Sequence, residues 1–207
     1  TVHCMRDFGI ETLEFNGNYS IKGVQIYEPT SYSVEGDCSQ AAFFAVANEL
    51  GSNIEITGVN RSSVQGDRAV FDIIDSMIKI NGNYSGFDID ASDIPDLVPV
   101  LTVLAAFAEG DSHIRGCKRL RIKESDRLVS ISTVLNSLGA DVRIVNDELE
   151  ITGVRELSGG VCSSFNDHRI AMSLAVASQR CSSPLTITGA ECVAKSYPTF
   201  FEDFRAL

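Results

Sequence analysis

The segment Asp96-Leu-Val-Pro-Val-Leu-Thr-Val-Leu-Ala-Ala-Phe-Ala108 gives the clearest view of how this chain is organised. Beyond its first residue the segment carries no charge, and its apolar residues would surround a helix on nearly every side. A helix that is apolar all round is normally buried, whereas a surface helix keeps a polar face. The segment therefore predicts a buried helix that follows the aspartate.

The same pattern occurs in two other places. Residues 41–50 follow Asp37, and residues 169–177 follow Asp167; both stretches are long and apolar. About 20 residues beyond each of the three aspartates, a short run typical of a β-strand ends on glycine. Such self-similarity indicates a repeated structural unit. The three glycine-ended runs are Ile56–Gly58, Ile114–Gly116 and Ile187–Gly189.

Each copy continues with a second helix, which starts about ten residues after the glycine. In residues 69–77, 128–138 and 200–207 apolar residues recur at helical spacing, so these helices are predicted to be amphipathic. The middle copy then closes with two strands, 140–145 and 148–151, which are joined by a short turn. The predicted unit is strand, helix, strand, helix, strand, strand (βαβαββ), about 60 to 70 residues long. The chain is therefore placed in the α/β (α+β) class.

The start of the chain matches the end of the middle copy, because residues 8–23 correspond in residue type to residues 138–153. Residues 1–30 are therefore predicted to be the tail of a preceding domain and a linker. Residues 31–207 are predicted to form the next domain. Its units would lie at about 31–90, 91–157 and 158–207, with the last one incomplete. We expect the chain to be a fragment of a longer protein.

A dense group of charges lies in Arg121-Ile-Lys-Glu-Ser-Asp-Arg-Leu128, directly after a basic run at 115–119. These two stretches hold six of the seventeen Lys and Arg residues, although the formal net charge is −11. Local potential, rather than net charge, determines whether a small anion binds. Ser125 and Asp126 can cap a helix that starts at Arg127, and a helix N-terminus attracts anions. The segment predicts an anion-binding site; a solvated, charged helix start is the alternative.

The overall composition narrows the possible partners. A net charge of −11 argues against nucleic acids and anionic membranes, because both bind basic proteins. No apolar run reaches the roughly 20 residues that a membrane-spanning helix needs, and no leader-like segment opens the chain. The six cysteines form no C-x-x-C pair, so reduced thiols are predicted rather than disulfides or a zinc site. We expect a cytoplasmic protein.

Three separated motifs resemble those of one family, the 5-enolpyruvylshikimate-3-phosphate (EPSP) synthases. They are the charged segment 121–128, Asn166-Asp-His-Arg-Ile-Ala-Met172 and Ala194-Lys-Ser-Tyr-Pro-Thr-Phe-Phe201. Three motifs in the same order are far more specific than any one of them. The resemblance covers essentially all 207 residues, and three shorter stretches fit the same pattern: Val34–Asp37, Gln65–Asp67 and Ile94–Asp96.

The resemblance implies the C-terminal half of a two-domain enzyme. Each domain of that family contains three βαβαββ units, which form an inside-out α/β barrel with buried helices and outer sheets. The helix N-termini of both domains face a shared cleft. Strands from the start of the whole protein close the third unit, and this chain lacks them.

The resemblance also implies a reaction. The family is a transferase of the shikimate pathway, which makes aromatic amino acids. It moves the enolpyruvyl group of phosphoenolpyruvate onto the 5-hydroxyl of shikimate 3-phosphate and releases phosphate. The vinyl carbon must be protonated while the hydroxyl attacks its neighbour, so the site needs an acid and a base. Both substrates are polyanions and need several cations, whereas no metal or organic cofactor is expected. The expected partners are the two substrates and the missing N-terminal domain.

The resemblance assigns roles to particular residues. Asp96 is the candidate base near the shikimate hydroxyl, and Glu124 is the candidate acid for the vinyl carbon. Lys123 would touch both substrates. The remaining candidates surround phosphoenolpyruvate: Arg127 and Arg169 at its carboxylate, Lys195 at its phosphate, and His168 beside them.

Five of these seven residues also have a purely structural interpretation. Asp96 could cap a helix, as is predicted for the aspartates at 37, 67 and 167. Glu124 could be only an ion-pair partner of Lys123 and Arg127. The two arginines could form structural salt bridges, but both would start helices, where a cation opposes the helix dipole. His168 could be a satisfied interior histidine.

Two other functions compete with the expected one. The related enolpyruvyl transferase that acts on UDP-N-acetylglucosamine shares the fold but lacks the Lys-Glu-Ser-Asp-Arg run. A non-catalytic anion-binding module could be built from the same repeats, but it would not need an acid and a base. Because half of a cleft cannot enclose two substrates, we expect this chain alone to have negligible turnover.

Overall fold

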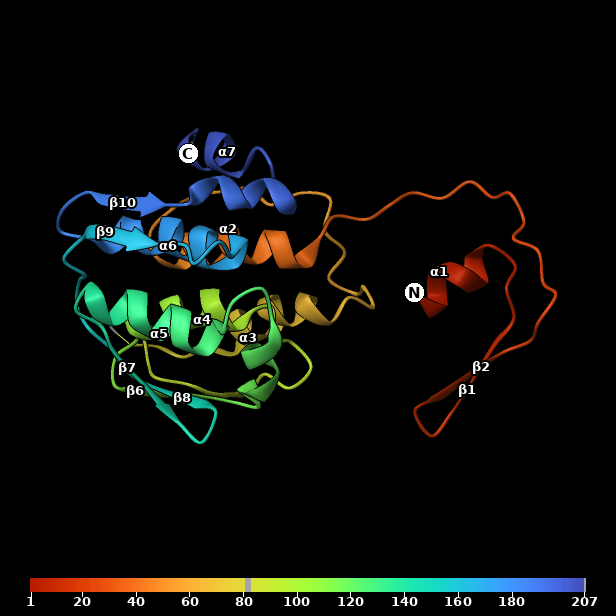
Figure 1. The fold of residues 1–207 in the computed structure, drawn as a ribbon, viewed down its shortest axis with the longest axis horizontal. Coiled ribbons are helices and arrows are strands. Elements are labelled where there is room, and N and C mark those ends of the chain that lie inside the picture. The colour runs from red at the N-terminus through yellow and green to blue at the C-terminus, as the bar shows by residue number, and fades with distance from the viewer. Residues whose placement is uncertain (81–82, 207) are drawn as a thin grey trace. The chain divides into compact units, whose positions relative to one another are not determined.

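The chain folds into two compact units, Thr1–Glu35 and Gly36–Leu207. The structure is a computed structural model, drawn in Figure 1, and it describes residues 1–80 and 83–206. The assignment of residues 1–30 to a preceding domain, and the three unit boundaries, stay predictions.

The first unit contains a helix and a hairpin. Helix α1 (Val2–Asp7) is followed by strands β1 (Thr12–Phe15) and β2 (Asn18–Ile21), which pair in antiparallel fashion. The turn residues Asn16 and Gly17 have φ angles of 48° and 73°, as a two-residue hairpin turn of positive φ requires. The strand–turn–strand structure that the match with residues 138–153 predicts for residues 8–23 is confirmed.

Three buried helices form the core of the second unit. They are α2 (Cys38–Glu49), α4 (Val98–Ala106) and α6 (His168–Ala177), and they pack against one another. Every residue of α4 and α6 is buried. A helix apolar on all sides gains most from burial when it is enclosed on all sides, so the prediction from the three apolar stretches is confirmed.

Amphipathic helices lie beside this core. In α5 (Arg127–Ser137), Leu128, Ile131 and Leu135 are fully buried on one face, while Val129 on the other face is exposed. The other two are α3 (Ala69–Ser76) and α7 (Phe200–Arg205). Short 3-10 helices link the elements: η1 (Gly66–Arg68), η2 (Cys117–Ile122), η3 (Ser178–Arg180) and η4 (Ala190–Lys195).

A four-stranded sheet covers one side of the helices (Figure 1). Its order is β5 (Asp88–Asp90), β6 (Asp111–Arg115), β8 (Glu148–Thr152) and β7 (Asp141–Val145). Strands β5 and β6 are parallel, and the other pairs are antiparallel. Residues of β6 and β8 alternate between buried and more exposed, which places one face of the sheet on the core. The predicted closing strand pair of the middle unit is confirmed.

The first and third copies of the repeat form smaller sheets. Strands β9 (Gly160–Ser163) and β10 (Leu185–Thr188) are parallel, and β3 (Lys79–Ile80) pairs with β4 (Asn83–Tyr84). The strand predicted at Ile56–Gly58 is wrong. The Gly36 amide donates to the Gly58 carbonyl at 2.8 Å, but one hydrogen bond does not make a ladder. The corresponding runs of the other units become strands because each has a parallel partner.

Two further predictions were drawn from the composition, one about the cysteines and one about membrane-spanning helices. All six cysteines are unbonded to one another, and Cys38, Cys117 and Cys162 are buried; that the thiols are reduced stays a prediction. None of the helices described in the structure is both long enough and apolar enough to cross a membrane.

Candidate functional site

Two helix N-termini carry the predicted arginines. Helix α5 begins at Arg127 behind Asp126, whose Oδ1 accepts a hydrogen bond from the Val129 amide at 3.2 Å. Helix α6 begins directly behind Asp167, whose Oδ1 accepts from the Arg169 amide at 3.0 Å. Both predicted caps are therefore present, and the arginine side chains start from the first turns of their helices.

Asp96 binds cations and does not cap its helix. The cap of α4 is Leu97, which makes no side-chain hydrogen bond. Oδ1 of Asp96 instead accepts from Arg127 Nη1 at 2.7 Å and pairs with Lys123 Nζ at 3.0 Å, while Oδ2 lies 3.3 Å from Arg169 Nη2. Burial would raise the pKa of Asp96, but these three cations outweigh burial and lower it. The capping interpretation of Asp96 is thus wrong.

Asp167 is the most buried group of the site and does more than cap α6. Its side chain is 0% exposed and that of Arg127 is 2% exposed. Arg127 donates to Asp167 through Nε at 2.7 Å and through Nη2 at 3.2 Å, and Ser125 Oγ donates at 3.0 Å. Burial would raise the pKa of Asp167, yet the hydrogen bonds and charge of Arg127 lower it. Sequence reasoning missed this ion pair, because capping alone already explained the aspartate.

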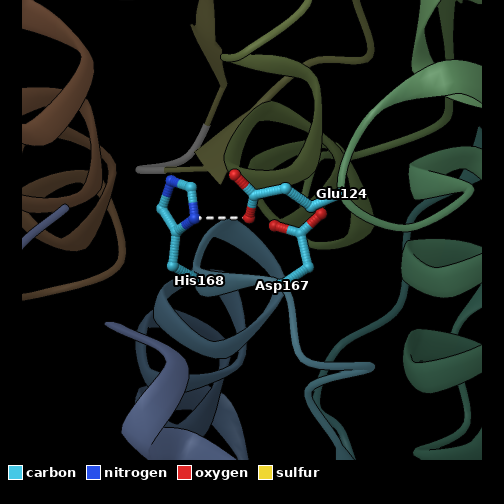
Figure 2. A group of neighbouring side chains, drawn as sticks. All are labelled: Glu124, Asp167 and His168. Carbon is cyan, nitrogen blue, oxygen red and sulfur yellow. Dashed lines mark hydrogen bonds and ion pairs between the residues drawn. The ribbon is translucent and has the colours of Figure 1, made fainter. Parts of the chain in front are cut away.

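Glu124 is held by a histidine and a lysine. Figure 2 shows its carboxylate facing the His168 ring. The distance from Glu124 Oε2 to His168 Nδ1 is 2.7 Å. Lys195 Nζ lies 2.5 Å from Oε1, and Arg127 Nη2 lies 3.9 Å from Oε2. Burial would raise the pKa of Glu124, but Lys195 and His168 lower it, so the group is ionised at neutral pH. The predicted pairing of Glu124 with Arg127 is present only at that longer distance, and Lys123 pairs with Asp96 instead.

His168 is a neutral donor in this arrangement. Its side chain is 6% exposed, and burial lowers its pKa more than the charge of Glu124 raises it. A neutral imidazole carries one N–H, and an ionised carboxylate can only accept. The proton of His168 therefore lies on Nδ1 and is donated to Glu124, which leaves Nε2 as an acceptor.

The described residues also offer one set of possible metal ligands. Ligand atoms of Glu124, Asp167 and His168 lie within 4.8 Å of one another. Figure 2 shows the three side chains together. Both carboxylates, however, are already bound by cations, Asp167 by Arg127 and Glu124 by Lys195. A metal ion would meet these positive charges, so the group does not suit a divalent cation.

Two charged residues of the motifs lie outside the site or act differently than predicted. Arg121 pairs with Asp126 and Asp147, each at 2.9 Å, and contacts none of the predicted site residues. Asp67 lies within η1 and accepts a hydrogen bond from Ser39 Oγ, whereas α3 has no side-chain cap. The predicted capping role of Asp67 is wrong. Burial raises the pKa of this carboxyl.

All the residues predicted for the site belong to one network of ion pairs and hydrogen bonds. The middle unit supplies Asp96, Lys123, Glu124 and Arg127, and the segment from 158 onward supplies the rest. Within the network carboxylates pair with cations, except that the neutral donor His168 bonds Glu124 and the hydroxyl of Ser125 bonds Asp167. Asp167 and Ser125 are members that were not predicted for the site. Its predicted members are Asp96, Lys123, Glu124, Arg127, His168, Arg169 and Lys195.

The comparison with known sequences identifies one family. The chain matches the family model of EPSP synthase (3-phosphoshikimate 1-carboxyvinyltransferase) over residues 1–204. It is 48% identical over 222 residues to a 3-phosphoshikimate 1-carboxyvinyltransferase of Clostridium perfringens, and 46% identical over 218 residues to one of Clostridium acetobutylicum. Both alignments cover 100% of this chain but 52% and 51% of the relatives. The chain thus spans about half the length of the curated relatives it matches.

Solved structures agree with this result. The EPSP synthase of Acinetobacter baumannii has a TM-score of 0.81 at 30% identity, over 96% of this chain and 52% of that one. The enolpyruvyl transferase NikO of Streptomyces tendae has a TM-score of 0.69 at 19% identity, over 100% of this chain and 51% of that one, and shows the fold alone. The predicted α/β fold of repeated units, with helices inside and sheets outside, is confirmed. The chain belongs to the EPSP synthase family.

Proposed function

We propose that this chain carries one half of an active site that transfers the enolpyruvyl group of phosphoenolpyruvate to the 5-hydroxyl of shikimate 3-phosphate and releases phosphate. The observation that carries the proposal is the single network in which four cations surround the two partly exposed carboxylates of Asp96 and Glu124. Two polyanionic substrates need such cations, and their reaction needs an acid and a base. The names of the curated relatives support the choice of substrates.

Asp96 is the proposed base for the acceptor hydroxyl. Its side chain is 31% exposed, so a hydroxyl can approach it from solvent. The surrounding cations keep it ionised and therefore able to accept a proton. Lys123, whose Nζ lies 3.0 Å from Oδ1, is proposed to contact both substrates, and its side chain is 26% exposed.

Glu124 is the proposed acid for the vinyl carbon, and it needs a proton before it can act. In the structure Lys195 keeps it ionised. The Lys195 side chain is 62% exposed and is free to turn toward an incoming phosphate group. When Lys195 binds the phosphate of phosphoenolpyruvate, Glu124 loses its closest cation. The pKa of Glu124 then rises toward that of a proton donor, with His168 still holding its orientation.

The carboxylate of phosphoenolpyruvate is proposed to bind Arg127 and Arg169. The side chain of Arg169 is 10% exposed and contacts Asp96 through a hydrogen bond of 3.3 Å, so the guanidinium can exchange that contact for a substrate carboxylate. Arg127 is 2% exposed and makes short hydrogen bonds to Asp96 and Asp167. Its contact with substrate therefore requires that Asp96 releases Nη1.

The proposal includes the surroundings of the site. We infer that the partner of this chain is the other half of a two-domain enzyme, which would supply the opposite wall of the cleft. The chain spans about half of its relatives, which supports this partner. The whole enzyme is proposed to be cytoplasmic, with no nucleic-acid or membrane partner.

The experiment restores the missing half. Residues 1–207 are fused to the part of the Clostridium perfringens relative that they do not match, and we call this protein the two-half enzyme. Phosphate release from phosphoenolpyruvate is then measured with shikimate 3-phosphate and, separately, with UDP-N-acetylglucosamine. We expect turnover with the first acceptor only, and none from the isolated chain. Turnover with UDP-N-acetylglucosamine, or with neither acceptor, would contradict the proposal.

A further inference from the structure

Two pairs of consecutive residues are joined to each other in the site. Glu124 and Ser125 lie just before α5, whereas Asp167 and His168 lie at the start of α6. Ser125 Oγ donates a hydrogen bond to Asp167 Oδ2 at 3.0 Å. Beside it, His168 Nδ1 donates to Glu124 Oε2 at 2.7 Å. The two hydrogen bonds are thus adjacent links between the same two stretches of chain, and the link through Ser125 has no role in the proposed function.

The backbone that carries Glu124 is not fixed by hydrogen bonds of its own. Within residues 1–80 and 83–206, the segment 123–125 makes no backbone–backbone hydrogen bond. A segment without such bonds takes its position from the contacts of its side chains. The side-chain contacts of 3.0 Å or less run from Lys123 to Asp96, from Glu124 to Lys195 and His168, and from Ser125 to Asp167.

The bond of Ser125 stays in place when substrates bind. The proposed function turns Lys195 toward a phosphate group and brings a hydroxyl to Asp96, so the contacts of these two residues with the segment are exchanged. Asp167 is 0% exposed, and no substrate is proposed to contact it. The bond between Ser125 and Asp167 can therefore hold the segment while the contacts around it change.

Asp167 does not depend on Ser125 for its own hydrogen bonds. It accepts from Arg127 Nε at 2.7 Å, from Arg127 Nη2 at 3.2 Å and from the Arg169 amide at 3.0 Å. An ionised carboxylate has about four acceptor sites, so most of them remain filled without the hydroxyl. The bond consequently determines where Ser125 lies more than it determines the state of Asp167.

We propose that Ser125 is a positioning residue, which anchors the backbone to Asp167 and thereby holds Glu124 against His168. The catalytic consequence rests on the proposed function, because it takes Glu124 to be the acid; the anchoring does not. Ser125 contacts neither substrate and transfers no proton. Without its hydroxyl the segment shifts, and the Glu124 carboxylate leaves the position from which it protonates the vinyl carbon.

The activity test uses the two-half enzyme with a matched control. Ser125→Ala removes the hydroxyl, and Ser125→Thr keeps it. The control is Ser178→Ala at the other end of α6, where a partly buried serine donates from Oγ to the Ala175 carbonyl at 2.6 Å. Both alanine variants lose one hydrogen-bonded hydroxyl, so a difference between them reports its position.

We expect Ser125→Ala to lower kcat at least about tenfold, because a misplacement of about 1 Å can cost about 100-fold. The dissociation constant of shikimate 3-phosphate, measured by calorimetry, should change less than about threefold, which also shows that the variant is folded. Ser125→Thr and Ser178→Ala should keep kcat within about threefold of the parent. An equal fall of kcat in Ser125→Ala and Ser178→Ala would contradict the inference.

A double variant shows whether Ser125 acts through Glu124. Groups that act as one unit have effects that do not add. Ser125→Ala should therefore lower kcat less than about twofold when it is introduced into Glu124→Gln. If it lowers kcat there by the same factor as in the parent, Ser125 acts by another route and the inference is wrong.

Proton NMR of residues 1–207 tests the anchoring without any substrate. Of the three histidines, His3 and His113 are exposed and His168 is buried. The ring N–H of an exposed histidine exchanges rapidly with water, whereas a buried N–H that is bonded to a carboxylate is protected. We expect a protected imidazole N–H resonance in the parent, in Ser125→Thr and in Ser178→Ala, and its loss in Ser125→Ala.

The resonance and the activity together separate this inference from the proposed function. A resonance that persists in Ser125→Ala would overturn the inference alone. Its loss with an unchanged kcat would refute the proposed role of Glu124 alone. If the two-half enzyme has no turnover, the proposed function fails, and the resonance still decides whether Ser125 holds Glu124 in place.

Discussion

The buried pair of Asp167 and Arg127 should contribute more to stability than any exposed pair of the chain, and Asp167→Asn tests this directly. The two side chains are 0% and 2% exposed, and two hydrogen bonds join them. Removing one partner of a buried ion pair typically costs about 3–5 kcal/mol, because the other charge stays buried. Asparagine still caps a helix and keeps one acceptor oxygen, and Arg127 keeps Asp96. We therefore expect a loss of about 3 kcal/mol, at the lower end of that range.

The chain offers a matched control in Asp126→Asn. Asp126 is also a helix-capping aspartate paired with an arginine, but that pair is 36% and 34% exposed. Exposed pairs contribute about 0–1 kcal/mol, and asparagine preserves the cap. The two variants thus carry the same chemical change and differ in burial.

The assay is urea unfolding at pH 7, followed by far-ultraviolet circular dichroism. With an m-value of about 2–3 kcal/mol/M, a loss of about 3 kcal/mol lowers the midpoint by about 1–1.5 M urea. Asp126→Asn should shift the midpoint only slightly. A midpoint shift of Asp167→Asn no larger than that of Asp126→Asn would refute the reasoning that burial makes this pair important.

Three further predictions concern acid, a motif arginine and a glycine. The pKa values of the site carboxyls (Asp96, Glu124 and Asp167) are lowered in the folded state. In the unfolded chain such carboxyls have pKa values of about 4. Their ionised forms therefore stabilise the folded state above that pH, and this stabilisation is lost as the pH falls below it. The free energy of unfolding should fall as pH drops below about 5, although Asp67 opposes the trend because its pKa is raised; a rise on acidification would contradict this. Arg121→Ala should leave the KM for both substrates of the two-half enzyme unchanged, because Arg121 pairs outside the site; a tenfold rise would place it inside. Gly116→Ala should cost more stability in urea unfolding than Gly139→Ala. Both glycines have positive φ, a cost of about 1–2 kcal/mol, but only at 116 would a Cβ lie 2.3 Å from Ser92 Oγ; equal losses would show that the contact is relieved without cost.

The parts of the fold that depend on local pattern could be predicted from the sequence. The segment 98–106 lacks any polar face, so burial was its only stable outcome. The turn at Asn146-Asp147 adopts positive φ angles of 51° and 62°, which both residue types tolerate. The strand expected at Ile56–Gly58 failed because a strand depends on a partner elsewhere in the chain, which local pattern does not reveal.

The convergence of the motif residues was predictable from the sequence, but their pairing was not. The motifs named residues that do converge, yet charge alone did not show that Arg127 is enclosed while Arg121 faces Asp147. Nor did the repeat distinguish Asp96 from Asp167: both follow the same pattern, but Asp167 caps its helix and Asp96 does not. Side-chain direction at a helix start depends on the surrounding packing, which sequence spacing does not contain.

The central claim is that Asp96 and Glu124 transfer protons within a cluster of cations, and turnover of the variants Asp96→Asn and Glu124→Gln in the two-half enzyme tests it most directly. Each change keeps the size of the side chain and removes its titration. General acid–base groups contribute about 100-fold to 10,000-fold to rate, so we predict that kcat falls at least about 100-fold in each variant. The dissociation constant of shikimate 3-phosphate, measured by calorimetry, should change less than about threefold. Variants that bind the acceptor and still release phosphate at the parent rate would contradict the account.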